Sequence, residues 1–292
     1  MFDYAQLTAL AAVHRRGSFD LAAAQLGLTP SAISQRVKAL EERMGCLLIR
    51  RGQPCMATEP GLRLILHLDE VILLESALSS DLPNPEPGLT TLRIAVNADS
   101  LATWVIPALA ATDGLLFDLV IDDQDHSQDW LRRGEVAGAI TSHPGPLQGC
   151  DTVALGALRY RATASPGYCA KWLPQGATAE ALARAPALTF SDKDSLQGAW
   201  LLRQTGQRFA FPTHRMASSH AFVDAALAGL GWGMNPEPLV AAHLAAARLI
   251  DIAPGNPLDV ALHWQFTRRI APALAPLTQA LRTAAAHVLR HP

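Results

Sequence analysis

Residues 17–43, GSFDLAAAQLGLTPSAISQRVKALEER, predict two short helices joined by a tight turn. Ser18 has a hydroxyl that can cap the start of a helix, and Gly27 can end that helix in a conformation that glycine adopts without strain. Thr29 then caps a second helix, with Pro30 at its first position, where a missing N–H costs nothing. Two helices arranged in this way are typical of a helix-turn-helix.

The second helix has two sides of different chemistry. Its apolar residues recur at i, i+4, i+7 and i+11 and should face a core: Ile33, Val37, Leu40 and Met44. The opposite side carries groups that hydrogen-bond phosphates and base edges: Ser31, Ser34, Gln35 and Lys38. A charge-laced surface helix is the alternative, but Glu41 and Glu42 come only at the end of this helix. The pattern favours DNA binding, with Arg36 flanking the polar side and reaching a phosphate.

The next stretch predicts a β-hairpin, or wing. Cys46–Arg51 has the character of a short apolar strand, Gly52-Gln53-Pro54 predicts a turn, and Met56-Ala57 can form the return strand. Arg50 and Arg51 are expected to contact the DNA backbone, with a solvated loop as the alternative. The DNA-binding residues expected in the whole domain are Ser18, Thr29, Pro30, Ser31, Ser34, Gln35, Arg36, Lys38, Arg50 and Arg51.

A long apolar helix is predicted from the capping residue Thr58 to about residue 82. Between Leu62 and Leu78 its apolar residues cover more than one side, which exceeds what packing on one domain requires. We therefore expect this helix to pair two chains. The residues expected at that interface are Leu64, Leu68, Val71 and Ile72. The proline-rich stretch at 83–88 is the clearest linker in the chain.

The stretch LAAAQLGLTPSAISQRVKALEERMGCLLIRR (21–51), followed by TEPG (58–61), resembles the N-terminal domain of LysR-type transcriptional regulators. Further along, LRIAVNADSLATWVIPAL (92–109) and LRRGEVAGAI (131–140) resemble the ArgP/LysG (IciA) subgroup of that family. The resemblance implies a winged helix-turn-helix, a linker helix and a two-lobed effector domain of the periplasmic-binding-protein type. It also implies a response to arginine or lysine and control of a gene for basic amino acid export.

Beyond the linker, strands alternate with helices, which is typical of an α/β fold with a parallel sheet. The first lobe is expected to contain strands at Leu92–Val96, Phe117–Ile121 and Val136–Thr141, and helices at Ser100–Ala111 and Ser127–Arg133. The second lobe is expected to include strands at Ala187–Phe190 and Arg215–Ser218 and a helix at Ala221–Ala228.

Together with the resemblance, these patterns divide the chain into four parts. The expected parts are the winged helix-turn-helix domain over 1–58, the linker helix over 59–82, a hinge over 83–90, and the effector domain over 91–292. Lobe I of the effector domain is expected at about 91–162 and 264–292, and lobe II at about 163–263.

In open α/β sheets, ligands bind beyond the carboxyl ends of the strands. In lobe I, a helix is expected to begin at that edge, at Ser100. The Ser100 hydroxyl, Thr103 and the free N–H groups of the first helical turn could hold a carboxylate. Nearby carboxylates could hold the positive ends of lysine or arginine. Helix capping is the alternative role for Ser100 and Ser218. The effector-binding residues expected are Asn97, Asp99, Ser100, Thr103, Asp122, Asp123, Thr141, Ser142, Ser218, Ser219, His220 and Asn235.

The charge of the chain is divided unevenly. The whole chain has a net charge of −2, but residues 1–66 carry eight Lys and Arg against five Asp and Glu. This basic part coincides with the helix-turn-helix, where phosphates require it. The remainder is acidic. That argues against an architectural or replication-origin DNA-binding protein, which would be basic throughout.

Other functional classes have little support in the sequence. The cysteines Cys46, Cys55, Cys150 and Cys169 show no C-x-x-C spacing, so we expect neither a zinc site nor a disulfide framework; a redox pair of Cys150 and Cys169 is the weaker alternative. No catalytic motif of the types G-x-S-x-G, H-E-x-x-H or phosphate-binding glycine loop occurs, so we expect neither an enzyme nor a cofactor or metal.

Neither an export signal nor an apolar run of membrane-spanning length is found, so we expect a cytoplasmic protein that does not contact a membrane. The lack of both an export signal and catalytic residues also argues against a solute-binding or enzymatic α/β protein with an accessory domain. The expected partners are double-stranded promoter DNA, a small-molecule effector, a second copy of the chain in a dimer or tetramer, and RNA polymerase. A LysR-type regulator with a different small-molecule effector is the remaining alternative.

Overall fold

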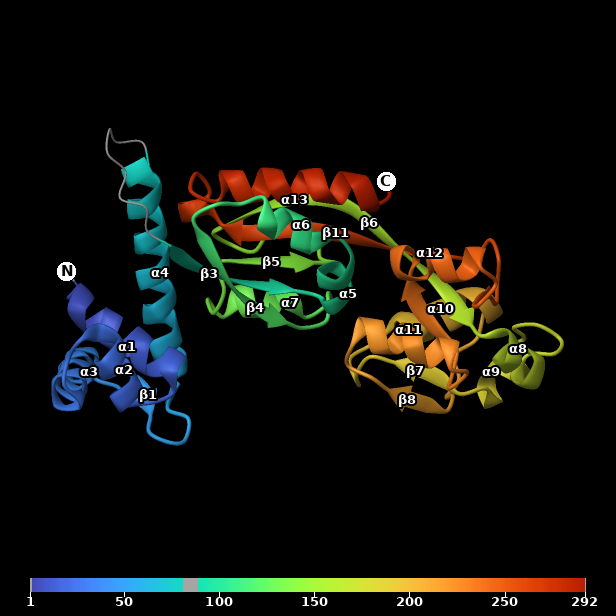
Figure 1. Cartoon of the computed structure of the whole chain (residues 1–292), viewed down its shortest axis with the longest axis horizontal. Helices are drawn as coiled ribbons and strands as arrows, with labels where there is room; N and C mark the ends of the chain where they lie inside the picture. The colour runs from blue at the N-terminus through green and yellow to red at the C-terminus, as the bar shows by residue number, and fades with distance from the viewer. Residues whose placement is uncertain (1, 81–88, 292) are drawn as a thin grey trace.

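The computed structural model describes residues 2–80 and 89–291. A small helical domain, a long helix and an α/β domain of two lobes follow one another along the chain (Figure 1). Most of the hinge expected over 83–90, and the last two residues of the expected linker helix, lie outside the described residues.

The N-terminal domain contains three helices and a hairpin. Their bounds are α1 Tyr4–Arg16, α2 Phe19–Leu26, α3 Pro30–Met44, β1 Ile49–Arg50 and β2 Met56–Ala57. The Ser18 hydroxyl accepts a hydrogen bond from the N–H of Asp20, and the Thr29 hydroxyl accepts one from the N–H of Ala32. Gly27 ends α2 with a φ of +64°, in the left-handed region that favours glycine. The predicted helix-turn-helix is therefore confirmed, including its caps.

One side of α3 packs into the core of this domain. Three residues of the expected apolar stripe are fully buried against α1: Ile33, Val37 and Leu40. The expectation that Met44 also faces the core is wrong, since its side chain is 39% exposed. Met44 is the last residue of α3, directly before the cap at Gly45, and the helix has passed the core at that point.

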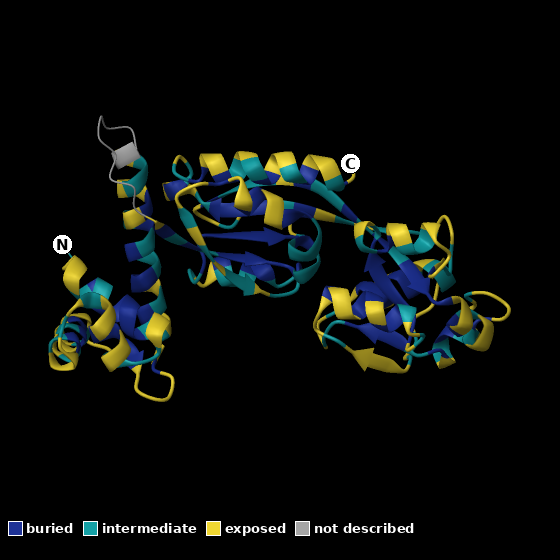
Figure 2. Ribbon diagram, in the orientation of Figure 1, coloured by how far each residue is buried: buried dark blue, intermediate teal, exposed yellow. Residues whose placement is uncertain are grey.

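The long helix α4, Glu59–Ser80, packs against two parts of its own chain (Figure 2). Toward the N-terminal domain it buries Leu64, Ile65 and Leu68. Toward the α/β domain it packs Leu66 and Leu73. The apolar excess seen in the sequence is therefore used in part by the second domain of the same chain.

These contacts correct the expected dimer interface. Leu64 and Leu68 were expected to meet a second chain, but within their own chain they are only 8% and 3% exposed. Ile72 is 38% exposed and Val71 is half-buried, so these two expected interface residues stay predictions. A third side of α4 presents apolar residues at i, i+3 and i+7: Val71, Leu74 and Leu78. In the described residues, the apolar surface of α4 that its own chain leaves uncovered includes those three residues.

Lobe I contains most of a sheet whose strand order in the described residues is β10-β6-β11-β5-β3-β4, with β9 paired to β6. In that sheet, β9 spans Gly233–Pro236 and β10 spans Ile250–Asp251. The strands of lobe I are β3 Thr90–Val96, β4 Leu115–Ile121, β5 Gly138–Thr141, β6 Cys150–Ala164 and β11 Leu258–Thr267. As predicted, β3, β4 and β5 are parallel, so their carboxyl ends share one edge. Strand β11 runs antiparallel between β5 and β6.

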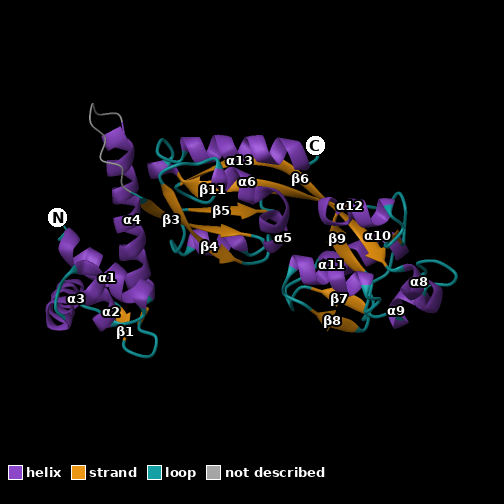
Figure 3. Ribbon diagram, viewed as in Figure 1, coloured by secondary structure: helices purple, strands orange, loops and turns teal. Residues whose placement is uncertain are grey.

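Helices cover both faces of this sheet (Figure 3). Ile94 and Val96 on β3 pack in one core with α6, Ile106–Ala110, and α13, Ala275–Val288. Ala95, between them, packs on the opposite face with Leu131 of the helix α7, which spans Ser127–Arg132. This alternation follows from the two-residue period of a strand.

Lobe II forms around the far ends of β6 and β11. Strands β9 Gly233–Pro236 and β10 Ile250–Asp251 pair with β6, and β7 Ala187–Thr189 pairs in parallel with β8 Thr213–Arg215. Its helices are α8 Pro166–Trp172, α9 Ala179–Arg184, α10 Leu196–Thr205, α11 Ser219–Leu227 and α12 Glu237–Ala245. The sequence patterns did not predict α8 and α9. The strand expected at Arg215–Ser218 ends at Arg215, because Ser218 caps α11.

Among the helices of the described segments, none combines the length and the apolar character that crossing a membrane requires.

Candidate DNA-binding surface and effector cleft

The polar side of α3 lies on the surface of the N-terminal domain. Its exposed residues are Ser31, Gln35 and Lys38, and its half-buried residues are Ser34 and Arg36. Next to the exposed Pro30, the Thr29 and Ser31 hydroxyl oxygens lie 3.0 Å apart at the start of the helix, where backbone N–H groups have no partner within the helix. Lys38 Nζ lies 3.6 Å from Glu42 Oε1 in an exposed pair that contributes little, so a phosphate can replace the carboxylate. The predicted residues of α3 therefore share one surface.

The wing adds two arginines to this domain. Arg50 is exposed on β1, which pairs with β2 in antiparallel register. The Arg51 guanidinium carbon lies 5.2 Å from the centre of the Phe19 ring, a cation–π contact that holds Arg51 beside the start of α2. Ser18 lies next to Phe19 and uses its hydroxyl as the cap of that helix.

Two substitutions separate base contacts from phosphate contacts. Gln35→Ala is expected to change sequence preference at a cost of about 1–3 kcal/mol, because Gln35 is exposed in the middle of the polar side of α3. Arg50→Ala is expected to weaken binding to all sequences alike and to flatten the salt dependence, because a phosphate contact carries no sequence information. Fluorescence anisotropy with operator and random DNA measures both. Equal losses on the two DNAs for Gln35→Ala would contradict its assignment.

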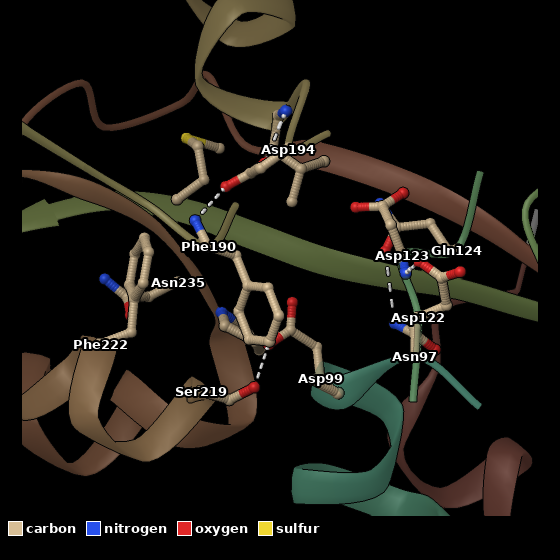
Figure 4. A pocket seen from close by; sticks show the side chains of 14 residues that line it. Asn97, Asp99, Asp122, Asp123, Gln124, Phe190, Asp194, Ser219, Phe222 and Asn235 are labelled. Carbon is tan, nitrogen blue, oxygen red and sulfur yellow. Dashed lines mark hydrogen bonds between the residues drawn. The ribbon is translucent and has the colours of Figure 1, made fainter. Parts of the chain in front are cut away.

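A cleft opens between the two lobes, beyond the carboxyl ends of β3 and β4 (Figure 4). Its volume, including the mouth, is about 460 Å³. Lobe I supplies Asn97–Asp99 and Asp122–Gln124, and lobe II supplies Phe190, Asp194, Leu196, Ser219, Phe222 and Met234–Pro236. Its position, at the carboxyl ends of parallel strands, is typical of a small-molecule site in an α/β protein.

Asp99 connects the two lobes across this cleft. One of its carboxylate oxygens accepts a hydrogen bond from the Ser219 hydroxyl of lobe II at 2.6 Å, and the other accepts one from the Tyr160 hydroxyl of β6 at 2.8 Å. Burial raises the pKa of Asp99 above its ordinary value, although both hydroxyl donors act in the opposite direction. Asp99 is therefore a bridge as well as a lining residue.

Asp122 is the acidic lining residue whose ionised form is best stabilised by its neighbours. Burial opposes its ionisation, but the Trp130 indole N–H, the backbone N–H of Asp123 and the Lys193 ammonium together lower its pKa. Asp122 is thus a stable carboxylate whose charge is already shared with Lys193.

Asp123 and Asp194 experience the opposite environment. Burial, together with the neighbouring charges of Asp125 and Asp194, raises the pKa of Asp123 to about 6, despite the N–H of Asp125 that it accepts. Burial likewise raises the pKa of Asp194, whose two oxygens accept the N–H groups of Phe190 and Leu196. Both carboxylates would gain from a positive charge in the cleft.

Two buried side-chain amides also line the cleft with oxygens that have no partner among the described residues. Asn97 is 2% exposed and donates only a long 3.4 Å hydrogen bond to Gln124, while its own oxygen accepts none. Asn235 is fully buried and donates to Thr163, and its oxygen is also without a donor. A buried acceptor without a donor is costly, so an N–H or ammonium group from a ligand would stabilise both.

Six of the predicted effector residues line the cleft: Asn97, Asp99, Asp122, Asp123, Ser219 and Asn235. Thr141 and Ser142 do not line it: the Thr141 hydroxyl donates to the carbonyl of Gln124 and the Ser142 hydroxyl donates to the carboxylate of Asp125, so both support the acidic loop. Ser218 is the cap of α11, and the exposed His220 is not a lining residue.

The expectation that Ser100 and Thr103 bind the effector is wrong. The helix starts after Asn97, at α5 Ala98–Ser100, and continues through a π-helical turn at Leu101–Val105 into α6. Ser100 therefore falls within the helix, where it is fully buried, and Thr103 donates its hydroxyl to the carbonyl of Asp99. Neither side chain lines the cleft.

Sequence reasoning missed Asp194, Phe190 and Phe222. Phe190 directly follows β7 and Asp194 comes a few residues later, as Asp122 and Asp123 follow β4. The rule of strand carboxyl ends could have found the first two if it had been applied to lobe II. Phe222 lies one turn into α11 after Ser219, and the apolar pattern of that helix gave no sign that it faces a cleft.

The comparison with known families covers both domains. Residues 4–62 match the model of the bacterial regulatory helix-turn-helix protein, lysR family, and residues 87–286 match the LysR substrate binding domain. The chain belongs to the LysR family of transcriptional regulators. This is a family of DNA-binding regulators and not of enzymes, and its two domains correspond to the helix-turn-helix and the two-lobed domain described above.

Individual LysR-type proteins are similar over nearly the whole chain. The regulator ArgP of Pseudomonas aeruginosa is 43% identical over 286 residues, which cover 96% of this chain and 95% of that protein. The structure of ArgP from Mycobacterium tuberculosis has a TM-score of 0.82, is 40% identical and covers all of both chains. The full-length LysG of Corynebacterium glutamicum with bound effector Arg has a TM-score of 0.69 and 36% identity and covers 99% of this chain and 100% of that chain.

Proposed function

We propose that this LysR-type regulator binds arginine or lysine in the cleft between its lobes and controls a gene for a basic amino acid exporter. The observation that carries the effector assignment is the acidity of the cleft. Asp99, Asp123 and Asp194 all line it, and none has a Lys, Arg or His nitrogen within ion-pair distance in the described part of the chain. Their raised pKa values have burial as the leading cause. A cationic ligand relieves that cost.

The cleft also suits the other groups of an amino acid. The carboxylate of the bound amino acid can approach the first N–H groups of α11, a helix of nine residues that begins at Ser219 on the cleft wall. The unpartnered oxygens of Asn97 and Asn235 can accept from the α-ammonium group. Phe190 and Phe222 can pack on the aliphatic part of the side chain. The LysG structure with bound Arg supports the same ligand class for a similar protein.

DNA binding requires a second copy of the chain in this proposal. A dimer joined through α4 would present two α3 helices to successive half-sites of an operator. We expect it to act in the cytoplasm as a dimer or tetramer, with RNA polymerase as a further partner at the promoter. The exporter gene as target is supported by the similarity to ArgP and LysG alone. Footprinting with genomic fragments tests it: protection upstream of an exporter gene supports the target, and protection only elsewhere overturns it.

Arginine affinity is expected to fall about tenfold between pH 7.5 and pH 5. Asp123, whose pKa is about 6, is protonated at the lower pH, and its proton must leave before the carboxylate can pair with a cation. The groups that face Asp123 are Asp125 and Asp194, which raise its pKa, and His126, which lowers it. Calorimetry should also detect proton release on binding near pH 6. Asp123→Asn should remove most of the pH dependence. Equal affinity of the wild-type chain at the two pH values would contradict this coupling.

A further inference from the structure

Lys193 pairs with Asp122 at the rim of the cleft. Its ammonium nitrogen lies 3.1 Å and 3.4 Å from the two carboxylate oxygens of Asp122. Lys193 comes from the segment after β7 in lobe II, and Asp122 directly follows β4 in lobe I. The pair therefore connects the lobes. Further along the same two loops, the Ser195 hydroxyl donates to Asp125 at 3.3 Å, which reinforces the same connection.

The two partners of this ion pair are held differently. Asp122 is fixed, because its oxygens also accept from the Trp130 indole and from the N–H of Asp123, and its side chain is only 17% exposed. The side chain of Lys193 is 53% exposed. An ammonium in that position regains water when it leaves, and half-exposed ion pairs contribute little to stability. Lys193 can therefore be displaced, whereas Asp122 stays in place.

Asp122 is also the cleft carboxylate whose ionised form the protein already stabilises. The other acidic lining residues are Asp99, Asp123 and Asp194, and in the described residues none of them forms an ion pair. The donors around Asp122 keep it ionised, as the lowered pKa shows. A cationic ligand that enters the cleft (Figure 4) thus meets the same carboxylate that Lys193 already neutralises.

We propose that Lys193 is an internal competitor of the effector: its ammonium joins the lobes through Asp122, and the ammonium or guanidinium of the bound amino acid replaces it there. This inference rests on the proposed function, because it assumes a cationic effector in this cleft. A guanidinium can make two parallel hydrogen bonds to one carboxylate, whereas the flexible Lys193 presents a single charged nitrogen. Because the ligand must displace Lys193 from Asp122, the Lys193–Asp122 ion pair lowers the apparent affinity for the ligand.

The test is a calorimetric titration of L-arginine into the full-length chain and its Lys193→Met variant. Loss of an internal competitor is expected to tighten arginine binding by about threefold to tenfold. The matched control is Lys171→Met, because Lys171 is an exposed lysine of lobe II whose ammonium lies over Trp172, on α8. That control should leave the affinity unchanged. Unchanged or weaker binding by Lys193→Met would overturn the competition.

A double-mutant cycle separates competition from a general effect of removing a positive charge. In an Asp122→Asn background, Lys193→Met should no longer tighten arginine binding, because the carboxylate for which the two cations compete is gone. Tightening of the same size in both backgrounds would mean that Lys193 acts at long range, and the competitor role would fall.

Hydrogen exchange tests the connection between the lobes without any ligand. Segments 122–126 and 190–196 should exchange faster in Lys193→Met than in the wild-type chain when no amino acid is added. Equal exchange would overturn the connection. If the wild-type protein binds neither arginine nor lysine, the proposed function fails and the competition fails with it. If the wild-type protein binds arginine and Lys193→Met binds it no more tightly, only this inference is overturned.

Discussion

Replacing Leu74 and Leu78 together by glutamate is expected to produce monomers and to weaken operator binding by about 10²–10⁴-fold. These leucines are 39% and 64% exposed on the side of α4 that faces neither domain of the chain. Burying two carboxylates in an apolar interface is costly, and a monomer loses the second half-site contact. Sedimentation measures the association state, and fluorescence anisotropy measures the operator affinity.

The control for this variant is a charged substitution at an exposed leucine elsewhere. Leu230→Glu is suitable, since Leu230 is 42% exposed between α11 and β9. It should leave both association and DNA binding intact. Leu68 is unsuitable as a probe, because its side chain lies in the core of the N-terminal domain and a charge there would unfold that domain. A stable dimer of the Leu74, Leu78 double variant would move the interface away from α4.

The second large effect is expected at Asp123. Asp123→Asn should weaken arginine binding about tenfold to a hundredfold at pH 7.5, because it removes a half-buried negative charge from the cleft. The asparagine oxygen can still accept the N–H of Asp125, so the loop keeps its conformation. Calorimetry measures the loss, and thermal unfolding confirms that the variant is folded.

Ser100→Ala is the informative comparison for that variant. The sequence predicted that Ser100 holds the ligand's carboxylate, whereas the structure buries its hydroxyl inside the helix without a partner in the described residues. Arginine affinity should therefore be unchanged in Ser100→Ala. A tenfold loss there, with little effect of Asp123→Asn, would reverse the two assignments.

Features that depend on a few neighbouring residues could be predicted from the sequence. Ser18, Gly27 and Thr29 act locally, and the helix-turn-helix follows from them. The start of the helix before Ser100 was misjudged, because Ser100 and Asn97 can both cap a helix and only the packing of that helix decides between them. Cap signals locate a helix end to within a few residues at best.

Features that depend on distant packing could not be predicted. The apolar excess of α4 indicated an additional partner, but a one-dimensional pattern cannot tell the second domain of the same chain, which receives Leu66 and Leu73, from a second chain. Phe222 could not be placed in the cleft from the sequence, because the apolar pattern of α11 fits a core-facing side equally well and only the packing of the two lobes puts this residue in the cleft wall. The acidic loop after β4 was found because one parallel sheet determines its position.

A calorimetric comparison of L-arginine with L-citrulline on the full-length chain tests the central claim most directly. Citrulline has nearly the same shape as arginine but a neutral urea group in place of the guanidinium. Because the cleft combines Asp99, Asp122, Asp123 and Asp194, arginine should bind in the micromolar range and citrulline at least about tenfold more weakly, a difference of about 1.4 kcal/mol. Citrulline or glutamate binding as tightly as arginine would contradict a cationic effector.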